Sequence, residues 1–224
     1  TTAHDALFSQ AGLAMGEHLC VHGAAGGVGV AAVQLGVATG ARVTATVRNE
    51  ALRAQVAELG AQVVDPEGFD EHGPFDVVLE LIGASNLPAD IASLATGGRI
   101  CVIGVGGGGF RAEVDLLALM NRRGRIHGST LRARPLEQKA LAAAAVARHV
   151  LPLVEQGRVR VPVAETFPLR DAAVAYYGAV LIAYTVAPWD VSPASVGFDL
   201  LVVATAVALG DVTRNRMAAT REHE

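Results

Sequence analysis

Short apolar runs rich in β-branched residues alternate with longer, alanine-rich segments between Ala6 and about Arg170. Short runs of this kind are typical of buried strands, and longer segments with apolar residues at helical spacing are typical of helices. The expected strands span residues 19–22, 42–47, 62–64, 76–80, 99–103 and 125–129. The expected helices span residues 28–39, 50–59, 87–95 and 135–156. Pro135 suits the first turn of the last helix, and Gly157 suits its end.

This alternation of strands and helices predicts the fold class. Strands that alternate with helices of this length form βαβ units, which produce a parallel sheet. The strands are almost wholly apolar, as expected where helices cover both faces of a sheet. We therefore predict an α/β domain with a Rossmann-type, doubly wound parallel sheet over residues 15–134.

A glycine-rich turn joins the first expected strand to the first expected helix. Residues 22–29 read His-Gly-Ala-Ala-Gly-Gly-Val-Gly. Such a turn lets backbone N–H groups and a helix N-terminus approach a pyrophosphate, and its last glycine lets the helix pack closely. An ordinary βα turn is the alternative, but the strand before and the helix and strand after match the context of a dinucleotide-binding motif. The residues predicted to bind the pyrophosphate are Gly26, Gly27, Val28 and Gly29.

The end of the second expected strand bears on the choice between NAD and NADP. NAD-specific sites place a carboxylate there for the ribose 2′-hydroxyl, but this chain has none between Thr44 and Glu50. Arg48 can instead pair with a 2′-phosphate, and Arg53 could supply a second cation about one helical turn further on. The alternative is an arginine that is simply solvated. We predict NADP, as NADPH, for the cofactor.

Composition and charge narrow the classes of function. The chain of 224 residues has a net charge of −4 and a pI of about 6.0, which favours neither nucleic acid nor an anionic membrane surface as a partner. Cys20 and Cys101 are too few for a disulfide scaffold or a four-thiolate zinc site, and both lie in apolar runs typical of buried positions. We expect a cytoplasmic protein without a signal peptide.

Familiar catalytic and metal-binding motifs are missing. The chain contains neither the G-x-S-x-G of hydrolases nor the G-x-x-x-x-G-K-[ST] of P-loop proteins. Its histidines show no metal-ligand spacing, so we expect no metal site. We expect Asp76 and Glu80 to be loop and edge charges, and His22 to fix the end of the first strand. No catalytic residue is predicted.

Residues 16–29 resemble the nucleotide-binding start of the medium-chain dehydrogenases/reductases. Within that superfamily the chain is similar to the zinc-independent NAD(P)H quinone oxidoreductases, the zeta-crystallin-like group. Further matching motifs lie at residues 97–100 (Gly-Gly-Arg-Ile), 103–104 (Ile-Gly), 128–135 (Gly-Ser-Thr-Leu-Arg-Ala-Arg-Pro), 149–153 (His-Val-Leu-Pro-Leu) and 167–173 (Phe-Pro-Leu-Arg-Asp-Ala-Ala). The resemblance covers residues 1–177.

This resemblance implies an enzyme that transfers hydride from NADPH to a small-molecule quinone or an activated alkene or carbonyl, such as an enone. It places the 2′-phosphate near Arg48 and Asn49. The residues that it places near the nicotinamide are Ile82, Gly83, Ile103, Gly104 and Leu131. It also implies a homodimer formed through the sheet edge of the cofactor domain.

The resemblance also implies differences from the family. The family begins with a catalytic domain, so residues 1–14 correspond to the end of the helix that joins the two domains. Residues 135–177 correspond to its C-terminal helical segment. Leu52 and Asp65 stand near the places of a lysine and a tyrosine that often bind the 2′-phosphate. Two alternatives stay open: a non-catalytic NADPH-binding module or truncated remnant, and a fragment of a zinc-type alcohol dehydrogenase.

Residues 178–224 form an apolar tail that departs from the family pattern. No charged residue lies between Ala172 and Trp189, which is just long enough to suggest a membrane helix. Pro188 lies near the end of this run, however, and its first residues belong to the family's helix. We favour a displaced reading frame or a fused fragment over a divergent native end, and either over a membrane anchor.

Overall fold

The computed structural model describes residues 1–107, 109–163, 166, 168 and 171. Residues 1–161 form one compact unit, and residues 162–224 belong to a second. The predicted tail over residues 178–224 and the last part of the predicted segment 135–177 lie outside the described residues. The fold and the site described below belong to the first unit.

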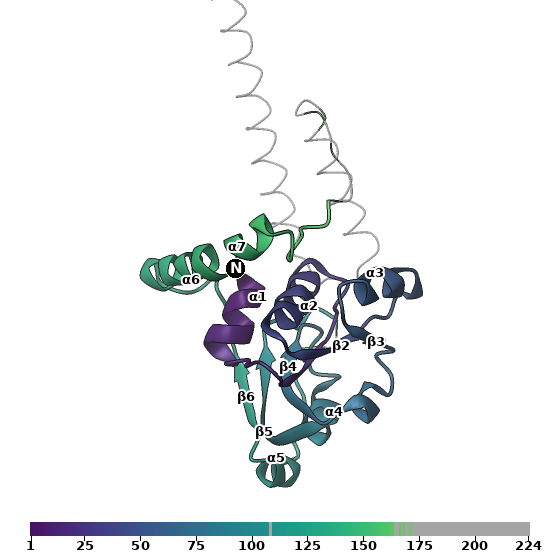
Figure 1. The fold of residues 1–224 in the computed structure, drawn as a ribbon. Helices are drawn as coiled ribbons and strands as arrows, with labels where there is room; N and C mark the ends of the chain where they lie inside the picture. The colour runs from purple at the N-terminus through teal and green to yellow at the C-terminus, as the bar shows by residue number, and fades with distance from the viewer. Residues whose placement is uncertain (108, 164–165, 167, 169–170, 172–224) are drawn as a thin grey trace, which may run out of the picture. The chain divides into compact units, whose positions relative to one another are not determined.

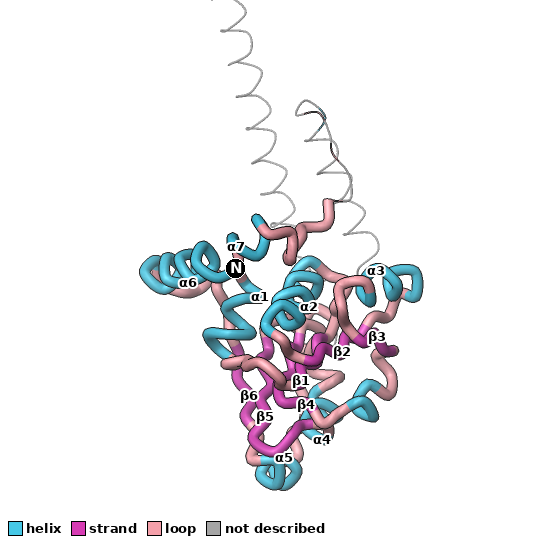
Figure 2. Tube along the Cα trace, in the orientation of Figure 1, coloured by secondary structure: helices cyan, strands magenta, loops and turns pink. Residues whose placement is uncertain are grey.

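The first unit is built on a six-stranded parallel sheet with the strand order β3-β2-β1-β4-β5-β6 (Figure 1; Figure 2). The strands are β1 (His18–Val21), β2 (Arg42–Thr46), β3 (Gln62–Val64), β4 (Phe75–Glu80), β5 (Leu94–Val102) and β6 (Arg125–Gly128). The winding reverses between β1 and β4, which are neighbours in the sheet. Open α/β sheets bind ligands at such a switch point. The predicted fold class is confirmed.

Helices cover both faces of the sheet because side chains alternate along each strand. In β4, Val77 and Leu79 face one hydrophobic core, whereas Val78 faces the other. The first core is covered by α1 (Thr2–His4), the π-helix η1 (Asp5–Gln10), α2 (Gly27–Thr39) and α3 (Arg53–Ala57). The second core is covered by η3 (Phe69–His72), α4 (Leu87–Ala92) and α5 (Leu116–Arg122). Cys20 and Cys101 are fully buried, as predicted, and the structure places them on opposite faces of the sheet.

The prediction of a single helix over residues 135–156 is wrong. The structure has two helices there, α6 (Leu136–His149) and α7 (Leu151–Glu155), with Val150 between them. Pro152 lies in the first turn of α7. Proline has no N–H to donate to the preceding turn and its ring crowds the carbonyl four residues earlier, so it interrupts a continuous helix.

Other element boundaries also differ from the predicted ones. β5 begins at Leu94 rather than residue 99, because Leu94 pairs with Phe75 and is fully buried. The helix expected over residues 50–59 is a short 3-10 turn, η2 (Glu50–Leu52), followed by α3. Helix α5 was not predicted, although Asp115 is a recognisable N-cap whose carboxylate accepts the Ala118 N–H at 2.9 Å.

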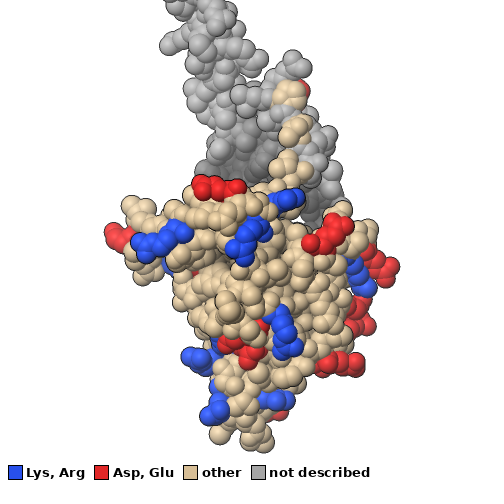
Figure 3. All heavy atoms as spheres, viewed as in Figure 1, with Lys and Arg blue, Asp and Glu red and all other residues tan. Residues whose placement is uncertain are grey.

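Basic and acidic side chains are interspersed over the face drawn in Figure 3, with uncharged surface between them. This distribution agrees with the small net charge of the sequence. None of the helices in the described part of the chain has the length and apolar character needed to cross a membrane.

Candidate functional site

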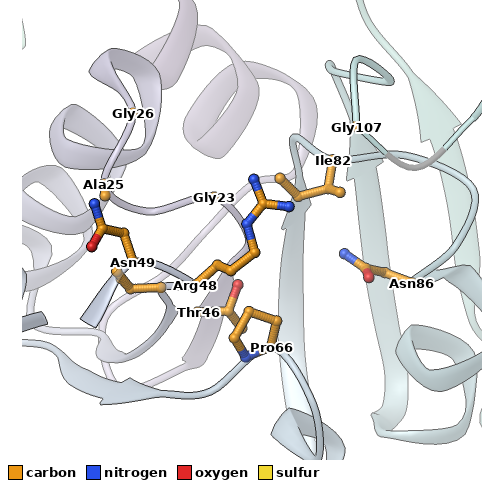
Figure 4. Close-up of a pocket in the computed structure, with 11 residues that line it drawn as sticks. Gly23, Ala25, Gly26, Thr46, Arg48, Asn49, Pro66, Ile82, Asn86 and Gly107 are labelled. Atoms are coloured by element: carbon orange, nitrogen blue, oxygen red, sulfur yellow. The ribbon is translucent and has the colours of Figure 1, made fainter. Parts of the chain in front are cut away.

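A pocket of about 280 Å³ lies at the carboxyl ends of β1, β2 and β4 (Figure 4). The glycine-rich turn, the segment after β2 and the loop after β4 form its walls. Its described lining residues are Gly23, Ala25, Gly26, Thr46, Val47, Arg48, Asn49, Pro66, Ile82, Asn86 and Gly107. This set contains one cation, Arg48, and no carboxylate. The pocket therefore suits an anionic ligand at the switch point of the sheet.

The glycine-rich turn brings the N-terminus of α2 to this pocket. Gly26 is the N-cap of α2, and no side chain among the described residues caps it, so N–H groups of the first turn are open to an anion. A side chain at Gly29 would place its Cβ 2.5 Å from the Gly23 carbonyl oxygen and 2.6 Å from Ala24 Cα. Only glycine fits there. The close packing is therefore between the helix and the backbone of the turn itself.

Arg48 supplies the positive charge of the pocket. It is exposed, and among the described residues its guanidinium has no hydrogen-bond or ion-pair partner. Figure 4 shows the side chain extending across the pocket toward Ile82. Beside it, Asn49 accepts the Ala51 N–H on Oδ1 at 3.1 Å, and its NH₂ group is directed toward the glycine-rich turn. Both side chains can therefore donate hydrogen bonds to a ligand.

Arg53 does not join Arg48 as a second free cation. Its Nε donates to the Val47 carbonyl at 2.9 Å, and its guanidinium also pairs with the Asp65 carboxylate. The Glu67 N–H and the Arg53 guanidinium, both bonded to Asp65, hold the pKa of that carboxyl below its usual range. Arg53 is thus neutralised locally. The structure does not support the expectation that it binds a phosphate.

Two further hollows lie at the carboxyl ends of β5 and β6. One, of about 360 Å³, is lined by residues 102–105 and 128–130. The other, of about 200 Å³, is lined by Thr2, Asp5, Ala6, Ile103, Ser129, Thr130, Leu131 and Arg132. Ile103 lines both hollows, Gly104 lines the first and Leu131 lines the second. Gly83 is buried, and a Cβ added to it would lie 2.7 Å from the Gly109 carbonyl oxygen.

A buried ion pair lies beneath the glycine-rich turn, and the sequence did not predict it. His22 Nε2 is 2.8 Å from Asp90 Oδ1 and 3.9 Å from Glu80 Oε2, and all three side chains are at most 1% exposed. His22 Nδ1 lies 3.1 Å from the Thr46 hydroxyl. The expectation that Glu80 is an edge charge is wrong, because β4 lies between β1 and β5. His22 and Asp90 are 68 residues apart, so no local pattern reveals the pair.

The charges of this cluster follow from burial and proximity. Burial alone would lower the pKa of His22, but its contacts with Cys20 and with the Asp90 carboxylate outweigh burial and raise it. Burial raises the pKa of the Cys20 thiol, so Cys20 is neutral near pH 7 and Asp90 is the effective partner of the imidazolium. Burial also raises the pKa of Glu80, while His22 and the N–H groups of Gly83 and Ile82 oppose that rise.

The fold and the pocket together define a cofactor-binding α/β domain of the dinucleotide type. The family model described as zinc-binding dehydrogenase matches residues 27–146, and the chain belongs to this family. The family lies within the medium-chain dehydrogenase/reductase superfamily of NAD(P)-dependent oxidoreductases, so the resemblance seen in the sequence is confirmed.

Individual relatives agree with this assignment. The human quinone oxidoreductase is 30% identical over 185 residues, which cover 78% of this chain and 54% of that protein. A mycobacterial protein solved in complex with NADPH has a TM-score of 0.65, with 26% identity over 79% of this chain and 56% of the other. A structure described as an enoyl reductase domain of a polyketide synthase has a TM-score of 0.60 and 27% identity, covering 74% and 95% of the two chains. The chain spans about half the length of the curated relatives that it matches.

The family description refers to zinc, but the described residues do not fit that ion. Zinc needs Cys, His, Asp or Glu ligands with free electron pairs. His22, Glu80 and Asp90 form the one group of such residues in the described part whose polar atoms lie within 4.8 Å of one another. Both ring nitrogens of His22 are already engaged, Nε2 with Asp90 Oδ1 at 2.8 Å and Nδ1 with the Thr46 hydroxyl at 3.1 Å, and the cluster is fully buried. The described residues therefore offer no fitting site for zinc.

Proposed function

We propose that this chain is the cofactor-binding part of an NADPH-dependent oxidoreductase that reduces a quinone or an activated alkene or carbonyl. The observation that supports it best is the pairing of an open helix N-terminus at Gly26 with an unpaired cation at Arg48 across one pocket. The pyrophosphate would bind the N–H groups at the start of α2. The 2′-phosphate would bind Arg48, which can donate two parallel hydrogen bonds.

The nicotinamide would lie toward the hollows lined by Ile103, Gly104 and Leu131. When bound, the cofactor supplies hydride, which carries two electrons to the acceptor. Reduction of a quinone then needs one proton from solvent, and the products are NADP⁺ and the hydroquinone. The contribution of this chain is to bind and orient the cofactor, and no described residue is assigned a proton-transfer role.

Calorimetry with NADPH and NADH, applied to the full chain and to Arg48→Ala, tests the cofactor assignment. Loss of a charge-assisted contact costs about 1.5–3 kcal/mol, which corresponds to roughly a 10- to 100-fold loss of NADPH affinity. NADH affinity should change little because NADH lacks the 2′-phosphate. Arg42→Ala is the matched control: Arg42 is an exposed arginine at the opposite end of β2.

If Arg48→Ala and Arg42→Ala weaken NADPH equally, Arg48 has no special role in cofactor choice. If the unmodified chain binds neither nucleotide, the cofactor assignment itself fails. Quinone-dependent oxidation of NADPH, followed by the loss of nucleotide fluorescence, then tests the reaction. The predicted homodimer and cytoplasmic location stay predictions, and size-exclusion chromatography with light scattering would decide the first.

A further inference from the structure

The ion pair of His22 and Asp90 adjoins the pocket through Thr46, which lines it, and reaches one of its walls through Glu80. Glu80 is the last residue of β4 and faces His22 at 3.9 Å. Its Oε1 accepts the N–H of Ile82 and, at 2.7 Å, the N–H of Gly83. One buried carboxylate oxygen thus binds two consecutive backbone N–H groups just after β4 ends.

The same carboxylate orients a side chain in this wall. Glu80 Oε2 accepts a hydrogen bond from the Asn86 amide at 3.0 Å. Ile82 and Asn86 both line the pocket, and Figure 4 shows them on the side opposite Ala25 and Gly26. Hydrogen bonds to a charged acceptor are about twice as strong as neutral ones. The hydrogen bonds from Ile82, Gly83 and Asn86 to Glu80 are therefore strongest when Glu80 is ionised.

Burial disfavours the ionised form of Glu80, and the His22 imidazolium is the neighbouring cation that favours it. The groups that face His22 are Cys20 on β1 (3.8 Å), Glu80 on β4, Asp90 on α4, the Thr46 hydroxyl on β2 and the ring of Phe69 on η3. They include two carboxylates, one neutral thiol and no further cation. Asp90 Oδ2 has no hydrogen-bond partner among the described residues, so Asp90 depends on His22. Without His22, two buried carboxyl groups would face each other uncompensated.

We propose that His22, held by Asp90, is a positioning residue that keeps Glu80 ionised and thereby fixes the Ile82–Gly83 turn at the dinucleotide pocket. This inference rests on the proposed function for its effect on the cofactor. The contacts themselves are independent of any ligand.

The variant His22→Gln removes the cation and keeps a hydrogen-bond donor. His22 lowers the pKa of Glu80, so the removal of His22 should raise that pKa. NADPH affinity of His22→Gln should fall about tenfold at pH 6.5 and recover as the pH rises, whereas the unmodified chain should change little over the same range. Adding Asp90→Asn removes the uncompensated carboxylate, so the double variant should regain most of the lost affinity.

A matched control is His18→Gln, at the opposite end of β1. His18 is also buried and also hydrogen-bonds a threonine of β2, with Nε2 2.9 Å from the Thr44 hydroxyl. His18→Gln should reproduce any general loss of stability without a pH-dependent loss of affinity. A double variant as weak as His22→Gln, or an equal pH dependence in His18→Gln, would show a merely structural role and overturn the proposal.

A second measurement does not depend on the cofactor. In NMR spectra of the full chain, between about pH 6 and 8, His22 should stay protonated on both nitrogens and the Ile82 and Gly83 amide signals should be constant. In His22→Gln those two amides should titrate, and in the double variant they should revert. If the chain binds no dinucleotide but the amides behave in this way, the proposed function fails and the network stands. If His22 itself titrates near pH 6.5, the network proposal fails.

Discussion

Arg99 on β5 binds the segment that precedes β1. Its removal should lower the stability of the first unit substantially. Its guanidinium pairs bidentately with Glu17, with NH1–Oε1 and NH2–Oε2 distances of 2.6 and 2.7 Å. It also donates to the carbonyl oxygens of Ala11 at 2.6 Å and Gly12 at 2.7 Å. The two charged side chains are 11% and 24% exposed, so water replaces these contacts poorly.

We expect Arg99→Met to lower the free energy of unfolding by about 3 kcal/mol. Breaking a buried ion pair from one side costs about 3–5 kcal/mol. The lower end applies because Glu17 is partly exposed and still accepts the Ala14 N–H at 2.7 Å. Methionine keeps most of the apolar stem, so the loss reports on the charged group.

Urea unfolding of the full chain, followed by circular dichroism, measures this change. The double variant Glu17→Gln/Arg99→Met should recover about 1 kcal/mol relative to Arg99→Met, because it removes the unpaired carboxylate. A loss below about 1 kcal/mol for Arg99→Met would refute the reasoning, since it would mean that the guanidinium contacts are replaced by water at almost no cost.

Two further predictions concern stability. The hydrogen bond from Arg99 lowers the pKa of Glu17, so the stabilisation is present above the usual pKa of a glutamate and is lost as the pH falls through the lowered value. The difference in unfolding free energy between the unmodified chain and Glu17→Gln should therefore shrink in acid, and a difference that grows below pH 4 would contradict this. Gly29→Ala should destabilise the unit by about 1–3 kcal/mol, because its Cβ overlaps the backbone of the turn. Gly27→Ala, where no atom lies within 4 Å of the added Cβ, should leave the melting temperature nearly unchanged.

The fold was largely predictable because its determinants are local. The alternation of short apolar runs and helical segments placed all six strands, with β3 at its observed bounds. The break at Pro152 was also available in the sequence, since proline in the interior of a helix is a recognised interruption. The early start of β5 was not, because Leu94 is drawn into the sheet by its pairing with Phe75.

Some features of the candidate site could likewise be predicted from local sequence, and others could not. The glycine-rich turn and Arg48 follow directly from the residues around β1 and β2, and the structure places both at one pocket. The pairing of Arg53 with Asp65 could not be derived, because the two residues meet only when β3 aligns beside β2. Glu80 was misjudged for a related reason: whether a charge at a strand end is exposed depends on the strand's position in the sheet.

The sequence by itself determined the fold class, the place of the dinucleotide turn and the family, because hydrophobic periodicity and a glycine turn between strand and helix are properties of neighbouring residues. Only the tertiary structure decided which charges are paired. His22 with Asp90, and Arg99 with Glu17, are 68 and 82 residues apart. Those pairs form because the sheet order brings distant segments together in a medium of low polarity, where an unpaired charge is costly.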